Sequence, residues 1–434
     1  MNIILLSGGS GKRLWPLSND VRSKQFIKIF NGEDGERESM IQRMVRSIRR
    51  IDKDANVTIA TAKSQISELI SQLGSDVSIS PEPVRRDTFA AIVLATAYLH
   101  DKLGVPEDEA VVVCPVDPYV EDDYFEALKK LYSLGEQGNA NLTLMGIEPT
   151  YPSEKYGYIM PVSKDKVAKV SAFKEKPNEE KAKEYIAQGA LWNAGIFSYK
   201  IGYVLKKAKE LIDYKGYQNL YDHYDAVRKI SFDYAIVEQE SSIQVMRFGG
   251  SWKDLGTWNT LTESMGEDTL GNVILDNKCS NVKAINSLDI PLVCMGLKDL
   301  IVAASPEGIL VSTPEASASI KPIVEKFDEP IRFEEKSWGD YHVIDVGPTS
   351  MTVKIKLKQG RSMAYHSHER RDEVWTIISG KGTVVVDEAI REIGPGDVVS
   401  LPKGSKHAIA AHSDMELIEV QIGEDICVED KKKY

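Results

Sequence analysis

The sequence is poor in cysteine, and the few thiols it has are far apart. Its 434 residues include only four cysteines, Cys114, Cys279, Cys294 and Cys427, and no two of them form a CxxC pair. This spacing argues against a zinc–cysteine site and is typical of reduced thiols in a cytoplasmic protein.

Long apolar runs and excess positive charge are also missing. No apolar stretch approaches the roughly 20 residues needed to cross a membrane as a helix. The chain enters a strand-like run at its first residues, so we expect no signal peptide. The formal net charge of −11 disfavours a general nucleic-acid-binding protein, although a local basic pocket is compatible with it. We therefore expect neither a membrane nor a nucleic acid as partner.

The composition is that of a globular protein with more than one domain. Apolar residues make up 42% and charged residues 27% of the chain, and 434 residues exceed what one core usually supports. Residues 1–265 alternate strand-like and helix-like segments, which predicts an α/β domain with a mixed, mainly parallel sheet covered by helices on both faces. The strand candidates are Ile3–Leu6, Val57–Ala60, Val77–Ile79, Ala110–Cys114 and Leu142–Ile147, and the helix candidates are Ser39–Arg50, Lys63–Leu73, Thr88–Leu103 and Tyr124–Leu134.

The pattern changes after residue 265. Residues 266–328 contain short β-type runs separated by Asn, Asp, Ser and Gly, which predicts an irregular or stacked β module with a helical linker at 316–326. Residues 329–434 are almost entirely β-like, as in a small β-barrel or jelly roll. The charged tail Glu424–Tyr434 is expected to fray.

A glycine-rich turn follows the first predicted strand. The turn Gly8–Gly11 comes directly after Ile3–Leu6, and Arg13 and Lys24 follow it. Glycines let backbone N–H groups approach an anion, so strand, turn and cations together predict a cradle for polyphosphate. Leu14 stands where the dinucleotide motif needs a third glycine, and Arg13 stands where the P-loop needs Ser or Thr. An ordinary strand–loop turn is the alternative.

Two acids follow strands or tight loops farther along the chain. Asp117 comes just after Ala110–Cys114, and Asp254 lies in a loop that contains Gly256. Acids at the carboxyl edge of such a sheet are suitable Mg²⁺ ligands beside substrate phosphates. A turn acid or a helix cap is the alternative for either one alone.

Three further segments carry polar side chains in suggestive places. Glu82 and Arg86 precede a helix that Thr88 could cap, and they could reach a base or a phosphate; a solvated basic turn is the alternative. Glu175 and Lys176 could contact a sugar hydroxyl and its phosphate, or could form a surface ion pair. Asn193 places an amide in an apolar strand, where a sugar hydroxyl or a turn could satisfy it.

In order, these segments resemble a known family of enzymes. The run comprises GGSGKRLWPLS, KQF, EPVRRDT, PVDPYVE, KYGYI, FKEKP, LWNAGIF, SFDYAIVE and WKDLGTW. Over residues 1–265 it resembles the sugar-1-phosphate nucleotidyltransferases, and within them the mannose-1-phosphate guanylyltransferases. The resemblance implies a Rossmann-like nucleotidyltransferase domain that converts GTP and mannose 1-phosphate to GDP-mannose and pyrophosphate. Residues 266–328 resemble the β-helix-like connector of the same enzymes.

The resemblance also implies roles for individual residues. The attacking phosphate is already an anion, so catalysis needs charge neutralisation and in-line positioning at the α-phosphorus rather than a protein nucleophile. The implied nucleotide-binding residues are Gly8, Gly9, Gly11, Glu82, Arg86 and Thr88; the catalytic residues are Arg13, Lys24, Asp117 and Asp254, the two acids holding Mg²⁺; the sugar-phosphate-binding residues are Gly157, Glu175, Lys176 and Asn193.

The chain departs from the family pattern at several positions. Asn19, Ser23, Asp87 and Pro118 stand where family members usually have Arg, Pro, Asn and His. These positions lie on the base and sugar sides, so another nucleoside triphosphate and another sugar 1-phosphate are the alternative substrates.

The predicted barrel carries a metal-binding motif. The pattern Gly360-x5-His366-x-His368-x4-Glu373-x6-Gly380 matches the first cupin motif, and Gly396-x5-Pro402-x-Gly404-x2-His407 matches most of the second. Three histidines and a glutamate make a site for Zn²⁺ or a similar divalent transition metal. A cupin that has lost its metal and is kept for packing or dimerisation is the alternative.

The barrel also resembles the type II phosphomannose isomerase domain that is fused to guanylyltransferases. Arg371 and Trp375 fall on its motif, whereas His366 replaces a glutamine and Val374 a histidine. No arginine follows Arg391, so an isomerase would need another cation on the sugar phosphate, with Lys403 and Lys406 as candidates. A bifunctional enzyme and a non-catalytic metal-binding module are therefore both open. Because cupins often pair through strand edges, the resemblance implies a homodimer.

Overall fold

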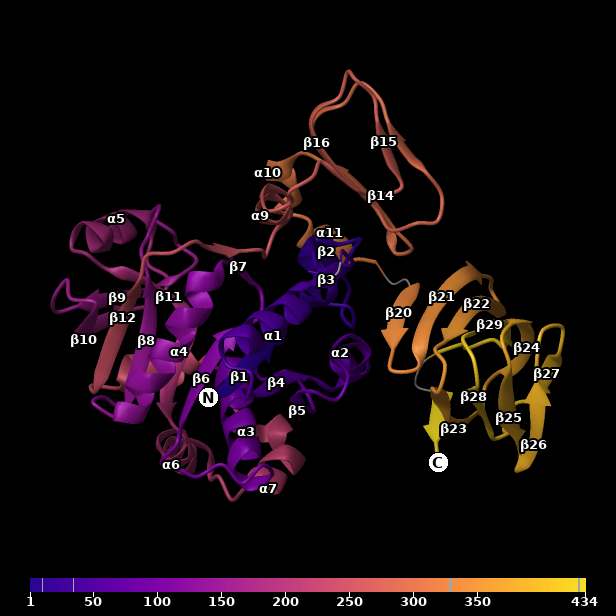
Figure 1. Ribbon diagram of the computed structural model, residues 1–434, viewed down its shortest axis with the longest axis horizontal. Helices are drawn as coiled ribbons and strands as arrows, with labels where there is room; N and C mark the ends of the chain where they lie inside the picture. The colour runs from indigo at the N-terminus through magenta and orange to yellow at the C-terminus, as the bar shows by residue number, and fades with distance from the viewer. Residues whose placement is uncertain (10, 34, 328–329, 428–429) are drawn as a thin grey trace. The chain divides into compact units, whose positions relative to one another are not determined.

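The structure is a computed structural model that describes residues 1–434 except 10, 34, 328–329 and 428–429 (Figure 1). The chain divides into two compact units. The first comprises Met1–Gly9, Lys24–Ile66 and Ser75–Met265, and the second comprises Ser10–Ser23, Ser67–Gly74 and Gly266–Tyr434. The division into three domains at residues 265 and 328 stays a prediction.

The first unit is built on one nine-stranded mixed sheet in the order β5-β4-β1-β6-β11-β8-β12-β10-β9. Neighbours among β5, β4, β1 and β6 are parallel, as are β8 and β12, whereas β11 and β10 run antiparallel to their neighbours. The predicted α/β class is confirmed. The strands are β1 Asn2–Ser7, β4 Asn56–Ala62, β5 Ser78–Glu82, β6 Ala110–Pro115, β8 Leu142–Ile147, β9 Gly157–Pro161, β10 Val167–Lys174, β11 Leu191–Lys200 and β12 Ile243–Phe248.

Helices cover both faces of this sheet. On one face of β6, Val111 and Val113 pack in one cluster with α3. On the opposite face, Cys114 lies against Tyr124 of α4. The helices are α1 Met40–Ile51, α2 Ile66–Leu73, α3 Asp87–Asp101, α4 Asp122–Gln137, α5 Glu179–Ala187, α6 Ile201–Ile212, α7 Tyr217–Asp222, α8 Phe232–Ala235 and α9 Trp258–Glu263. Two small ribbons, β2 Lys28–Asn31 with β3 Arg37–Ser39 and β7 Pro118–Val120 with β13 Trp252–Asp254, complete the unit.

The start of α3 differs from the expected capping. The N-cap residue is Arg86, which makes no side-chain capping bond, and Asp87 lies in the first turn with a φ of 67°. The Thr88 hydroxyl instead accepts a hydrogen bond from the Phe232 N–H at 2.9 Å. The predicted cap at Thr88 is therefore wrong, because its hydroxyl makes a tertiary contact instead.

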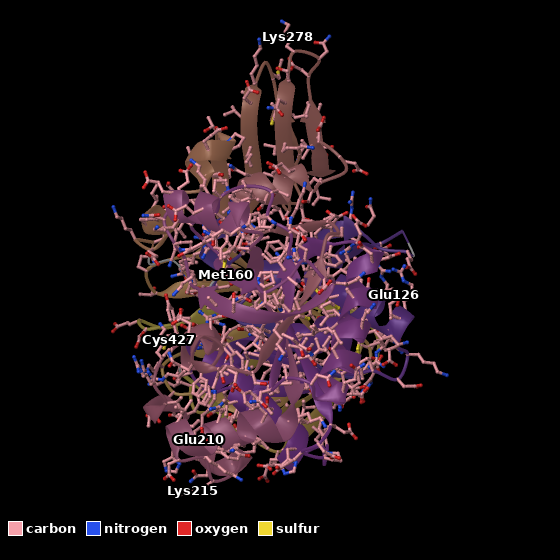
Figure 2. All side chains as sticks on the ribbon, turned by 90° about the vertical axis from the view of Figure 1, so that its left-hand side faces the viewer. Glu126, Met160, Glu210, Lys215, Lys278 and Cys427 are labelled. Carbon is pink, nitrogen blue, oxygen red and sulfur yellow. The ribbon has the colours of Figure 1, made fainter. Side chains whose placement is uncertain are left out.

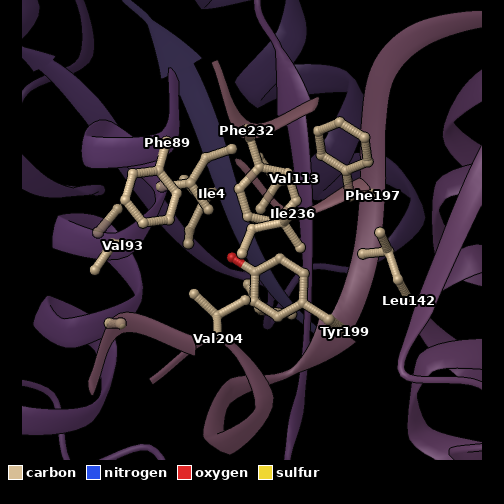
Figure 3. Packing of buried hydrophobic residues seen from close by; sticks show 14 of the residues in the cluster. Ile4, Phe89, Val93, Val113, Leu142, Phe197, Tyr199, Val204, Phe232 and Ile236 are labelled. Atoms are coloured by element: carbon tan, nitrogen blue, oxygen red, sulfur yellow. The ribbon is translucent and has the colours of Figure 1, made fainter. Parts of the chain in front are cut away.

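Aromatic rings fill the core between α3, α6 and the sheet (Figure 3). The rings of Phe197 and Phe232 lie 5.0 Å apart, and Tyr199 packs beside them with its hydroxyl 2.8 Å from the Thr96 hydroxyl. Pairing the two hydroxyls removes the cost of burying polar atoms in this core. Charged side chains such as Glu126, Glu210 and Lys215 point outward instead (Figure 2).

In the second unit, residues 269–312 form short stacked strands, as the sequence predicts. β14 pairs with β16, β16 with β18 and β15 with β17, all parallel, and β19 closes the module antiparallel to β18. The two short helices α10 Pro314–Ser317 and α11 Lys321–Val324 occupy the predicted linker. The strands are β14 Thr269–Gly271, β15 Val273–Leu275, β16 Ser280–Asn286, β17 Leu292–Cys294, β18 Lys298–Ser305 and β19 Gly308–Ser312.

The C-terminal part is a barrel of two facing sheets, β20-β21-β22-β29-β24-β27 and β26-β25-β28-β23-β30. The expectation of a frayed tail is wrong for its last residues, because β30 pairs with β23. The strands are β20 Phe333–Lys336, β21 Gly339–Val346, β22 Ser350–Leu357, β23 Ser362–His368, β24 Asp372–Ser379, β25 Gly382–Val386, β26 Ala389–Ile393, β27 Val398–Leu401, β28 His407–Ala411, β29 Met415–Ile422 and β30 Lys431–Lys433.

Over the residues that the structure describes, every helix is too short or too polar to cross a membrane.

Two leucines on α6 provide a matched test of the core. Leu205 is 2% exposed in the aromatic cluster, whereas Leu211 is 52% exposed. We expect Leu205→Ala to lower the free energy of unfolding by about 2–5 kcal/mol, because it opens a cavity. Leu211→Ala should change it by less than about 0.5 kcal/mol. Urea unfolding of both variants measures this, and equal effects would contradict the placement of α6.

Candidate active site and metal centre

Two acids far apart in the sequence meet at one cation in the first unit. Asp117 follows β6, and Asp254 ends β13, which pairs with β7 so that Asp254 lies opposite Pro118. Lys24 lies in the 3₁₀ helix Lys24–Phe26, and its ammonium is 2.6 Å from Asp117 Oδ2 and 3.4 Å from Asp254 Oδ1. The structure therefore brings together three of the four predicted catalytic residues.

The charges in this cluster support one another. Burial works against the charge of Lys24, but Asp117 and Asp254 outweigh it, so the pKa of Lys24 is raised. Both carboxylates keep about a third of their surface exposed, at 33% and 37%. Two accessible carboxylates that already share one positive charge are a donor set that fits Mg²⁺. A Cβ on Gly256 would lie 3.0 Å from Asp254 Oδ1, so glycine keeps room for this carboxylate.

The glycine turn approaches the nucleotide-side residues closely. A Cβ on Gly8 would lie 3.9 Å from Glu82 Oε1, and Gly9 has a φ of 145°, which favours glycine. The Gly9 carbonyl accepts a hydrogen bond from the Arg85 guanidinium at 3.1 Å. Gly8 and Glu82, which sequence reasoning assigned to the same nucleotide, are thus neighbours.

Gly11 and Arg13 belong to the second unit by their contacts. A Cβ on Gly11 would lie 2.8 Å from the Asn19 carbonyl oxygen and 2.9 Å from Ser23 Cα, so only glycine fits this turn. The Arg13 side chain is exposed. The predicted roles of both toward a triphosphate stay predictions.

The remaining nucleotide-side residues have partners within the protein. Glu82 is buried and accepts a hydrogen bond from the Tyr224 hydroxyl at 2.8 Å, and burial raises its pKa. The Arg86 guanidinium donates to the Asp225 carbonyl, and Thr88 accepts from the backbone of Phe232. Their contact with a nucleotide stays a prediction.

The four predicted sugar-phosphate residues lie close together. Gly157 of β9 lies opposite Asn193 of β11. A Cβ on Gly157 would lie 2.5 Å from Glu175 Oε2, so the Glu175 carboxylate packs directly over the glycine. Glu175 is only 6% exposed and pairs with the Lys176 ammonium at 2.9 Å, while its buried Oε2 has no partner among the described residues. Lys176 adopts a φ of 45°, a strained conformation of the kind found at functional sites.

One acid beside these sugar-side residues, Asp233, was not predicted from the sequence. Asp233 accepts a hydrogen bond from the Asn193 amide at 2.6 Å, and it fixes which way this amide points. Burial, reinforced by the charge of Glu175, raises the pKa of Asp233 to about 6. The run SFDYAIVE belongs to the family resemblance, but a single acid at the start of a short helix carries no signal of its own.

Contacting aromatic rings connect the sugar-side residues to the acid pair. The Tyr156 ring lies 5.1 Å from the ring of Trp192, the residue before Asn193. It also lies 5.5 Å from the ring of Trp252, two residues before Asp254. Both predicted halves of the site therefore border the same aromatic side chain.

The second unit holds a compact histidine cluster. His366 and His368 lie on β23 and His407 begins β28, and one ring nitrogen of each lies within 4.8 Å of the others. Nδ1 of His366 is 2.6 Å from the Ala364 carbonyl and Nδ1 of His407 is 3.0 Å from the Ser405 carbonyl, which leaves each Nε2 available. Burial lowers the pKa of His366 to about 3 and that of His368 to about 4, so both rings are uncharged and could act as metal ligands.

Glu373 adjoins this cluster. Its Oε1 is 2.9 Å from Arg371 Nε and 3.2 Å from His368 Nε2, and its Oε2 accepts from the Trp375 indole at 3.3 Å. Although burial opposes the charge, His407, His368 and Arg371 lower the pKa of Glu373 to about 2, so it is ionised.

The donor set fits a transition metal. Nε2 of His407 and Nδ1 of His368 are buried and have no hydrogen-bond partner among the described residues. Buried polar atoms rarely stay unsatisfied, and an ion held by neutral imidazoles and a carboxylate would satisfy them. The predicted ligands His366, His368 and His407 are thus together, with Glu373 against two of them.

Lys24, Asp117 and Asp254 concentrate charge at the edge of an α/β sheet. This is the arrangement of an enzyme that transfers phosphorus-containing groups by positioning and charge neutralisation. The family model described as nucleotidyl transferase matches residues 2–269. The chain belongs to this nucleotidyl transferase family. A second model, described as mannose-6-phosphate isomerase C-terminal, matches residues 331–433.

Curated relatives match this chain over nearly their whole length. The chain is 29% identical to a mannose-1-phosphate guanylyltransferase of Escherichia coli, over 97% of this chain and 95% of that protein. It is 26% identical to the alginate biosynthesis protein AlgA of Pseudomonas aeruginosa, over 97% and 93%. A solved structure described as mannose-1-phosphate geranyltransferase from Thermus thermophilus shares the fold, with a TM-score of 0.63 at 24% identity, over 76% of this chain and 99% of that chain.

The histidine cluster predicts one tightly held divalent transition metal ion in the barrel. We expect His407→Ala to lower the metal content after Zn²⁺ loading and gel filtration, because one of the four donors is lost and the ion is held more weakly. His412→Ala is the matched control, since His412 is 52% exposed and lies outside the cluster. Elemental analysis of both variants measures the metal content. Equal metal content in His407→Ala and the wild type would contradict the assignment.

Proposed function

We propose that the protein is a mannose-1-phosphate guanylyltransferase that makes GDP-mannose and pyrophosphate from GTP and mannose 1-phosphate with Mg²⁺. The observation that carries this proposal is the sharing of the Lys24 cation by Asp117 and Asp254, at 2.6 and 3.4 Å. The curated relatives that match 97% or more of the chain include several proteins named for this activity, which supports the choice of base and sugar.

The reaction exchanges one phosphorus–oxygen bond for another. A phosphate oxygen of mannose 1-phosphate attacks the α-phosphorus of GTP in line, and the bond from that phosphorus to the pyrophosphate oxygen breaks. Mg²⁺, held by Asp117 and Asp254, would supply charge neutralisation. Lys24 places a further positive charge beside the transferred group, and Arg13 is proposed to stabilise the leaving pyrophosphate.

The sugar-side residues orient the attacking molecule. Lys176 is half exposed and is proposed to bind the sugar phosphate. The buried Oε2 of Glu175 has no partner among the described residues and is proposed to accept a hydrogen bond from a sugar hydroxyl. Asp233 holds the Asn193 amide so that it can bind another hydroxyl. Fixing both groups before the reaction lowers the entropy cost of bringing the phosphate to the α-phosphorus.

The proposed setting follows from the substrates and relatives. GTP and sugar phosphates are cytoplasmic metabolites, so we place the enzyme in the cytoplasm, and a homodimer remains a prediction. Relatives include proteins named for alginate and xanthan biosynthesis. We therefore propose that the GDP-mannose supplies polysaccharide synthesis.

A matrix of substrates tests the transferase. Pyrophosphate release is measured with mannose 1-phosphate and each of the four common nucleoside triphosphates, and we expect GTP to be preferred. Asp117→Asn should lower kcat by about 10²–10³-fold, because a preorganised charge is lost. A preference for UTP, CTP or dTTP would overturn the guanylyl assignment, and a full rate in Asp117→Asn would overturn the metal assignment.

The barrel supports a second candidate function, the isomerisation of mannose 6-phosphate and fructose 6-phosphate. The observation that favours it is the histidine cluster with Glu373 inside a domain that matches the mannose-6-phosphate isomerase C-terminal model. We expect turnover in the metal-loaded protein and its loss with a chelator, read by coupled formation of fructose 6-phosphate. No turnover after confirmed metal loading would leave the barrel as a binding module.

A further inference from the structure

The last strand of the chain lies beside the histidine cluster. β30 pairs antiparallel with β23, with Lys431 opposite His368 and Lys433 opposite His366. Directly opposed residues of an antiparallel pair project their side chains to the same face of the sheet. Lys431 and Lys433 therefore share the face of the two histidines, and Lys432 shares the opposite face with Ser367.

The strand is anchored at both ends. The buried Asp430 carboxylate accepts hydrogen bonds from the backbone N–H groups of Glu369 at 2.9 Å and Arg370 at 3.2 Å. At the other end, the Tyr434 N–H donates to the Tyr365 carbonyl at 3.1 Å. These bonds fix the register and so fix which lysines face the histidines.

The candidates Lys403 and Lys406 do not take this position. The Lys406 ammonium lies 4.3 Å from the centre of the Tyr434 ring, and Lys432 lies 5.5 Å from the same ring. The Tyr434 hydroxyl is 3.2 Å from Ser367 Oγ, on the face away from the histidines. Lys403 is exposed, and its backbone N–H binds Asp372.

The carboxylates near Lys431 and Lys433 do not neutralise the positive charge of these two lysines. Arg371 already pairs with Glu373 at 2.9 Å. The Glu419 carboxylate, which is buried on β29, accepts a hydrogen bond from the Gln421 amide. Within the described part of the chain, no carboxylate lies within 4.0 Å of the Lys431 or Lys433 ammonium.

We propose that Lys431 and Lys433 form the anion-binding wall of the barrel and hold the phosphate of a phosphorylated sugar whose neutral oxygens face the histidine cluster. Residues two apart on one strand are spaced by about 7 Å, so both ammonium groups can reach one phosphate dianion. This inference rests on the ligand site proposed for the barrel, but it requires no isomerase turnover. The short C-terminal strand thus supplies the charge that no arginine after Arg391 provides.

Calorimetric titration of the full-length, metal-loaded protein with mannose 6-phosphate, inorganic phosphate and mannose tests the proposal. We expect the double variant Lys431→Met/Lys433→Met to bind mannose 6-phosphate about 10–100-fold more weakly than the wild type. Inorganic phosphate should lose affinity in parallel, and Lys431→Arg should retain most of it. Lys432→Met is the matched control on the opposite face and should bind within about twofold of the wild type.

All variants keep the same nucleotidyltransferase site, so a difference in affinity reports the barrel. Thermal unfolding and pyrophosphate release serve as checks of folding. If the double variant binds mannose 6-phosphate as tightly as the wild type, or if the wild type shows no binding up to about 10 mM, the proposal is overturned. Lysine-dependent phosphate binding in a protein that takes up no metal would support it while removing the metal site.

Discussion

The sharing of one cation by two carboxylates is the constraint on which the first unit depends. Asp117 and Asp254 would repel one another without a positive charge between them, and Lys24 supplies it. The β7–β13 ribbon exists at this edge of the sheet and brings the second acid beside the first. Gly256 keeps the Asp254 carboxylate free to turn. Both carboxylates stay about a third exposed, so they remain accessible to a cation from the solvent.

In the barrel the candidate metal ligands are buried, unlike the partly exposed carboxylates of the first unit. Desolvation keeps His366 and His368 neutral, while the Glu373 charge survives because Arg371 and the histidines surround it. Neutral nitrogen donors suit a transition metal, whereas the exposed oxygen donors of the first unit suit Mg²⁺. The candidate metal ligands of the two units therefore differ in their degree of contact with water.

Much of the fold follows from local patterns. The alternation of strands and helices in residues 1–265, the short strands of the connector and the barrel strands all appear where the apolar runs predict them. The cap of α3 was not predictable, because Thr88 uses its hydroxyl to bind Phe232, far away in sequence. Asp233 was missed for the same reason, since only its contact with Asn193 reveals it.

By itself the sequence determined the class of fold, the three barrel histidines that could hold a metal and the order of the motifs, because these depend on spacing along the chain. Only the tertiary structure decided which distant charges meet. Lys24 lies beside two acids because the β7–β13 ribbon brings Asp254 to the sheet edge where Asp117 lies. The Glu175 carboxylate can pack over Gly157 because glycine has no Cβ. The side of the barrel that receives Lys431 was set by the register of β30 on β23, and a shift of one residue would turn that lysine away from the histidines.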